Sequence, residues 1–97
     1  MKPEVVLELL EQTAEQLGIR VSYEPLQIGI KSSHGGLCRV KGEYRVIVDK
    51  RATTEERVAT VATALARFDT SGLEIPQKLR EILRMYEPSS KHRQTAA

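Results

Sequence analysis

The chain has 97 residues, with 15 Lys and Arg against 13 Asp and Glu, a hydrophobic fraction of 40%, and no Trp, one Phe and three Tyr. This length corresponds to a single domain and leaves little room for a separate catalytic domain. No apolar run approaches the ~20 residues of a membrane-spanning helix. The few aromatic side chains offer little surface on which nucleic-acid bases could stack.

The excess positive charge lies at the end of the chain. Residues 88–97 contain Lys91 and Arg93 and no acidic side chain, so residues 1–87 carry 13 basic and 13 acidic side chains. A neutral body argues against duplex nucleic acid as a partner, because phosphate binding requires a basic imbalance on the domain. Residues 25–54 are basic and lie between acidic segments, which is typical of internal or intersubunit charge complementarity.

The single cysteine, Cys38, cannot form a disulfide within the chain. Lys2, Pro3 and Glu4 lead into an acidic amphipathic pattern instead of the uninterrupted apolar stretch of a secretory signal. We therefore expect a cytoplasmic protein with a reduced thiol and no membrane association.

Residues 3–18 predict a helix, with Pro3 in its first turn and Gly18 at its end. Its glutamates share one face, and this face favours solvent over a metal, because hard cations need oxygen ligands that converge from several directions. These glutamates are Glu4, Glu8, Glu11 and Glu15. Residues 19–24 alternate apolar and polar side chains and predict a half-buried strand. Residues 26–30 allow a further short strand.

Residues 37–49 predict a β-hairpin with Gly42 in its turn. A two-residue loop at Gly42 and Glu43 would mix charged and apolar groups on each face. A three-residue loop that begins at Lys41 separates them better, and we expect this register because a shift of one residue exchanges the two faces. It buries Cys38, Val40, Tyr44, Val46 and Val48 on one face and places Leu37, Arg39, Arg45 and Ile47 on the other.

Residues 53–72 predict a second helix, in which Thr53 and Glu56 have the spacing of a capping box. Residues 73–87 predict a third helix, with Pro76 in its first turn. The two helices follow the strands directly in the sequence.

Helices before and after a run of strands predict an α+β fold. We expect a single α+β domain over residues 1–87, with a small antiparallel sheet of three or four strands, an N-terminal helix and two C-terminal helices. Residues 88–97 are polar and lack apolar periodicity, so they predict a disordered tail.

The stretch SSHGGLCRV places His34 four residues before Cys38. A thiol enzyme would need these two side chains together, but four extended residues span roughly 13 Å, and the chain has no Asn to orient the imidazole. One Cys and two His cannot complete a tetrahedral zinc site within one chain. We therefore expect no enzymatic activity, no metal and no cofactor, with a thiol enzyme as the least favoured alternative.

Arg39 and Arg45 would be cross-strand neighbours in the expected register. Like charges at such positions repel each other, so an acidic group or a bound anion should lie nearby. An internal or solvated charge pair with a purely structural role fits the same residues equally well. With Leu37 and Ile47 they form the binding surface that we predict. The leading hypothesis is a protein-interaction module with an unidentified protein partner, or a homodimer.

The alternative is a binder of anions or single-stranded nucleic acid, which would use the same face together with the Lys91–Arg93 segment. Phosphate binding weakens steeply as salt rises, whereas a mainly apolar interface does not. Salt dependence therefore distinguishes the two hypotheses.

The block GGLCRVKGEYRVIVDKRATTEERVATVATALARFD resembles a recurrent element of small uncharacterised bacterial proteins. The hairpin followed by a helix also resembles the core of compact zincin-type metallopeptidases, in which the helix corresponding to residues 54–69 carries an HExxH motif. That segment has no His in this chain. The resemblance implies a fold without the metal or the hydrolysis, retained as a binding module.

Overall fold

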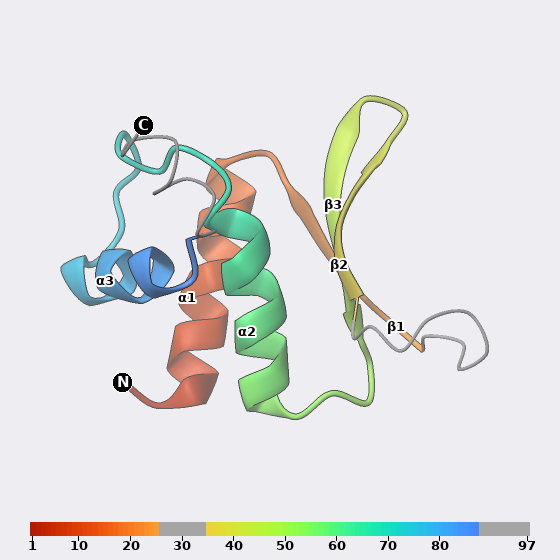
Figure 1. Cartoon of the computed structure of the whole chain (residues 1–97), viewed down its shortest axis with the longest axis horizontal. Coiled ribbons are helices and arrows are strands. Elements are labelled where there is room, and N and C mark those ends of the chain that lie inside the picture. The colour runs from red at the N-terminus through yellow and green to blue at the C-terminus, as the bar shows by residue number, and fades with distance from the viewer. Residues whose placement is uncertain (26–34, 88–97) are drawn as a thin grey trace, which may run out of the picture.

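The computed structural model describes residues 1–25 and 35–87. Its elements are α1 (Pro3–Gln16), β1 (Arg20–Glu24), β2 (Gly35–Val40), β3 (Glu43–Asp49), α2 (Thr54–Leu65) and α3 (Gln77–Met85). The strands form one three-stranded sheet, and the three helices lie on one side of it (Figure 1). The predicted α+β class, with one helix before the strands and two after them, is confirmed.

Helix α1 follows the sequence pattern closely. Pro3 begins it, and Val6, Leu10 and Ala14 form its buried stripe. The helix ends near Gly18, whose φ of 76° turns the chain back toward the sheet, a backbone conformation that glycine adopts without steric cost. The chain therefore enters β1 directly beside the helix that precedes it.

The sheet has the order β1-β3-β2, with β3 in the centre. Val46 and Val48 of β3 are fully buried, so the strand with the most deeply buried side chains lies between the other two. Strands β2 and β3 pair antiparallel, as predicted, but β1 runs parallel to β3. The sheet is therefore mixed. The predicted strand at 26–30 and the predicted tail at 88–97 lie outside the described residues.

The hairpin register differs from the prediction by one residue. Val40 pairs with Glu43 and Arg39 with Tyr44, so the loop consists of Lys41 and Gly42 alone. Both loop residues have positive φ, 52° and 82°. This is the signature of a type I′ turn, whose twist matches that of the two strands.

The predicted three-residue loop is therefore wrong. The geometry of the turn determines the register, at the cost of mixing charged and apolar side chains. Because side chains alternate along a strand, the shift moves every side chain of β2 to the opposite face.

The capping box of α2 is confirmed. Thr53 Oγ1 accepts a hydrogen bond from the Glu56 N–H (3.1 Å), and Glu56 Oε1 accepts one from the Thr53 N–H (2.9 Å). Helix α2 ends at Leu65, earlier than predicted. In the segment that follows, Asp69 Oδ1 accepts hydrogen bonds from the Ser71 N–H (3.0 Å) and hydroxyl (2.7 Å). Such local bonds compete with helix continuation.

Helix α3 begins at Gln77, with Pro76 as its N-cap. The predicted start at residue 73 is too early, because the residue before a proline disfavours helical geometry. The core lies between the sheet and the helices, and its fully buried larger side chains are Leu10, Thr13, Val46, Val48, Val61, Leu65 and Leu79. In the part of the chain that the structure describes, no helix is long and apolar enough to cross a membrane.

Candidate functional site

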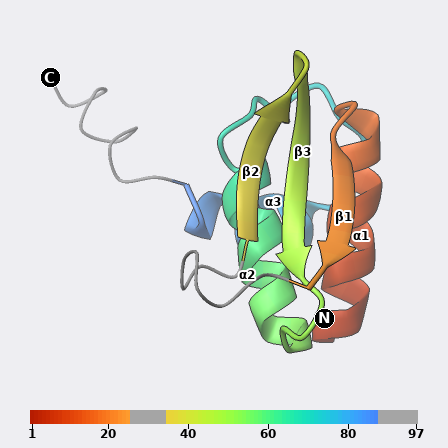
Figure 2. The same ribbon diagram turned by 90° about the vertical axis from the view of Figure 1, so that its right-hand side faces the viewer.

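The face of the sheet that points away from the helices is covered by no described helix or strand, and we call it the open face (Figure 2). Val46 is buried on the helix-covered face, so alternation along β3 places Arg45 and Ile47 on the open face. Leu37 pairs with Val46 and therefore points toward the helices, as does Arg39. The four predicted binding residues are thus divided between the two faces.

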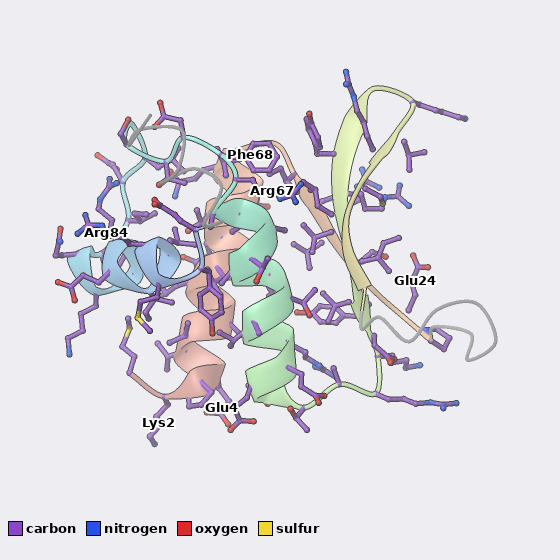
Figure 3. All side chains as sticks on the ribbon, in the orientation of Figure 1. Lys2, Glu4, Glu24, Arg67, Phe68 and Arg84 are labelled. Atoms are coloured by element: carbon purple, nitrogen blue, oxygen red, sulfur yellow. The ribbon has the colours of Figure 1, made fainter. Side chains whose placement is uncertain are left out.

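Arg39 packs against one aromatic side chain, that of Tyr44, on the helix-covered face. Its guanidinium lies 5.4 Å from the centroid of the Tyr44 ring. The Tyr44 ring in turn meets Phe68 edge to face, with centroids 5.1 Å apart, and Figure 3 shows Phe68 at the end of α2. Cross-strand repulsion between Arg39 and Arg45 was the reason to expect an anion nearby. The actual register removes that repulsion, since Cys38 pairs with Arg45.

The open face instead carries charged pairs that involve β1. Arg20 is the β1 neighbour of Arg45, and Glu24 is the neighbour of Asp49. The pair between them is Ser22 and Ile47. Along β1 and β3, these pairs change from a basic pair through a neutral pair to an acidic pair. Alternation along β3 also places Glu43, which pairs with Val40, on the open face beyond the basic pair.

Neither guanidinium of the basic pair, Arg20 or Arg45, has a hydrogen bond or an ion pair to another residue that the structure describes. At the acidic end, Glu24 Oε2 accepts a hydrogen bond from Ser22 Oγ (2.8 Å), and Asp49 Oδ1 accepts one from the Arg51 N–H (3.0 Å). Like charges on neighbouring strands destabilise the sheet. Both ends of the open face therefore carry a repulsion that an external group of opposite charge would relieve.

Cys38 is half-buried on the open face. Its predicted burial in the core is wrong for the same reason as the hairpin register. His34, its proposed catalytic partner, lies outside the described residues. Within residues 1–25 and 35–87, no three His, Cys, Asp or Glu side chains gather in a way that could hold a metal ion.

A second polar cluster joins α1, β1 and α2. The Tyr23 hydroxyl donates a hydrogen bond to Glu11 Oε2, and the Arg57 guanidinium lies 5.0 Å from the Tyr23 ring centroid. Arg57 also donates to the carbonyl oxygens of Ala52 (3.1 Å) and Lys50 (2.9 Å). The cluster therefore links the edge strand to both long helices.

Burial raises the pKa of Tyr23, and so does the neighbouring Glu11 carboxylate, while Arg57 opposes the shift. The sequence indicated Glu11 only as one member of a solvated acidic face. Its contact with Tyr23 depends on the way α1 packs beside β1, which helix periodicity alone does not specify.

A groove of about 600 Å³ runs between α1 and the outer edge of β1. Its helix wall is acidic or polar, and its strand wall is formed by residues 18–21 and Tyr23. The helix wall consists of Glu8, Glu11, Gln12 and Glu15. Three of the four glutamates predicted to share a helix face therefore line one groove.

No protein-family model, curated protein or solved structure matches this chain. The resemblance to zincin-type metallopeptidases and to small bacterial proteins is tested by none of these comparisons and stays a prediction.

Proposed function

We propose that this protein is a non-enzymatic protein-interaction module that binds a second copy of itself through the open face. The observation that carries the proposal is the pair of repulsions on that face, Arg20 beside Arg45 at one end and Glu24 beside Asp49 at the other. A surface with separated basic and acidic ends is complementary to its own inverted copy. Ile47 lies between the two ends and supplies an apolar centre.

The order of charges selects one symmetry. A two-fold axis that lies in the interface, perpendicular to the strands, reverses the strand direction of the partner and sets each basic pair over an acidic pair. It also brings the two copies of Ile47 together. A two-fold axis along the strands would set arginines over arginines, which is unfavourable. The proposed dimer is therefore two open faces packed with antiparallel strands.

The size of the face predicts a weak association. Three strands about 4.8 Å apart and roughly 20 Å long present a face of about 300 Å². Standard stable interfaces bury about 800 Å² per partner. We therefore expect a dimer with a micromolar or weaker dissociation constant, held largely by charge and sensitive to salt. Because phosphate binding is also sensitive to salt, salt dependence alone does not distinguish this dimer from the alternative.

The alternative function, binding of anions or single-stranded nucleic acid, has less support from the structure than from the sequence. Arg39 and Arg45 point to opposite faces, and the basic pair on the open face has an acidic pair on the same surface. A strand of phosphates that followed the face would meet both signs of charge.

The test is sedimentation equilibrium at protein concentrations from about 10 to 500 µM, in low and high salt. The wild type should form dimers that dissociate as salt rises. Arg20→Glu/Arg45→Glu should weaken association at least about 10-fold, because like charges then meet across the interface. The matched control is Lys50→Glu/Arg51→Glu, which makes the same change of charge at two exposed positions beyond the sheet and should leave the dimer intact.

A monomeric wild type at the highest concentration would contradict the proposal, as would equal effects of the two double variants. A labelled single-stranded oligonucleotide included in the same series tests the alternative. The anion-binding function would be favoured by two results together. The wild type would bind the oligonucleotide without self-associating, and Arg20→Glu/Arg45→Glu would lose that binding.

A further inference from the structure

The outer edge of β1 offers free backbone hydrogen-bonding groups. The Lys50 N–H donates to the Glu24 carbonyl (2.9 Å), so the peptide groups of Glu24 point toward β3. Because peptide groups alternate sides along a strand, those of Ser22 and Arg20 point the same way. The N–H and C=O groups of Val21 and Tyr23 therefore point outward, and no described strand pairs with them.

These outward groups lie along the groove beside α1. An extended peptide in the groove could pair with Val21 and Tyr23 and would lie against the helix wall. Two glutamates of that wall, Glu8 and Glu15, are exposed and seven residues apart. They are therefore about 10.5 Å apart along the helix axis. Tyr23 and Glu11 bridge the strand and the helix, which fixes the two walls relative to each other.

We propose that the β1 edge binds a basic peptide in extended conformation, which joins the sheet as a fourth strand. Backbone pairing with Val21 and Tyr23 provides the hydrogen bonds of strand addition. Every second side chain of the added strand faces α1, at a repeat of about 6.7 Å. The separation of Glu8 and Glu15 lies between one and two such repeats, and the long flexible side chains of Lys or Arg at alternate positions can span the difference to both carboxylates.

The opposite edge of the sheet does not offer the same site. The groove beside β2 is smaller, about 380 Å³, and its α2 wall is formed by Ala59, Thr60, Thr63, Ala64 and Arg67. This wall contains no carboxylate. Charge therefore distinguishes the two edges and selects a basic strand for β1. Arg20 of the open face also lines this groove. The contacts proposed for the peptide are made instead by the backbone of Val21 and Tyr23 and by the carboxylates of Glu8 and Glu15, so neither test below alters a residue of the open face.

The first test varies the ligand. A fluorescent peptide in which lysine and valine alternate is titrated with the protein, and its anisotropy is compared with that of a glutamate–valine peptide. Only the lysine peptide should bind. N-methylation of alternate residues then probes the backbone, since an added strand presents the N–H groups of one alternate set to β1. Methylation of one set should weaken binding at least about 10-fold, and methylation of the other set less than about 2-fold.

The second test varies the protein without changing the strand. Glu8→Gln/Glu15→Gln removes two exposed charges of the groove and should weaken binding of the lysine peptide about 3- to 10-fold. Glu74→Gln/Glu81→Gln removes two exposed charges outside the groove and is the matched control. The proposal would be overturned if the two variants had equal effects or if the two methylation patterns did. It would also be overturned if the lysine peptide did not bind at a protein concentration of about 1 mM.

Discussion

The two faces of the sheet are built from the same strands but are specified by different forces. On the helix-covered face, Val46 and Val48 are fully buried against α1 and α2. On the open face, the neighbouring side chains Arg45, Ile47 and Asp49 of β3 remain in reach of solvent or of a partner. One face is determined by the removal of apolar area from water, and the other carries an ordered set of charges.

This difference separates residues required for folding from residues available for binding. A buried side chain on the helix-covered face, such as that of Val46 or Val48, cannot change without disturbing the packing of the core. A side chain on the open face can change with little effect on folding, so charges there can be arranged for a partner. Two adjacent residues of β3 therefore have different roles: Val48 is required for folding, and Ile47 is available for binding.

The largest expected effect comes from substituting these two neighbours. Val48→Ala should lower the free energy of unfolding by about 2 kcal/mol, because it removes two buried methyl groups and leaves a cavity. Ile47→Ala should lower it by less than about 1 kcal/mol in the monomer, yet weaken self-association. Chemical denaturation at low protein concentration, with sedimentation of the same samples, measures both quantities.

The comparison between the faces fails if Ile47→Ala destabilises the monomer as much as Val48→Ala does. It also fails if Ile47→Ala leaves the dimer unchanged while Val48→Ala, still folded, abolishes it.

A smaller effect should come from the turn that assigns side chains to the two faces. Gly42 has a φ of 82°, so Gly42→Ala should destabilise the protein by about 1 kcal/mol. Lys41→Asn should stabilise it by about 0.5 kcal/mol, because asparagine followed by glycine is the preferred type I′ sequence. Thermal unfolding of the two variants measures both signs. Destabilisation by Lys41→Asn would instead support the three-residue loop.

The smallest effect concerns Tyr23, the polar contact at the rim of the helix-covered face. Its pKa is raised above the ordinary value near 10, so the protonated hydroxyl contributes stability that is fully present below about pH 10 and is lost as the pH rises further. The free energy of unfolding of the wild type should therefore decline more steeply above pH 10 than that of Tyr23→Phe. Parallel curves for the two proteins would contradict this role.

The sequence alone predicts the fold class and most element positions. Apolar periodicity locates α1, and the spacing of Thr53 and Glu56 locates the start of α2, because these signals are local. The register of the hairpin is not determined by one local signal. The apolar pattern favours one loop length and the glycine at 42 favours another, and only the strand twist decides between them.

The open face could not be predicted for a related reason. Its charged pairs depend on the parallel pairing of β1 with β3, which joins segments that are far apart in the sequence. Arg45 and Ile47 were identified from the hairpin, but Arg20, Glu24 and Asp49 were not. The edge groove likewise depends on the packing of α1 beside β1 and has no signature in either segment.

The proposed dimer is tested most directly by two variants with opposite open faces. Arg20→Glu/Arg45→Glu makes the charged side chains of the open face acidic, and Glu24→Arg/Asp49→Arg makes them basic apart from Glu43. Each variant alone should sediment as a monomer, and an equimolar mixture should form a heterodimer, because every charged pair then meets its opposite. A mixture that remains monomeric, or a variant that dimerises alone as well as the wild type does, would contradict self-association through the open face.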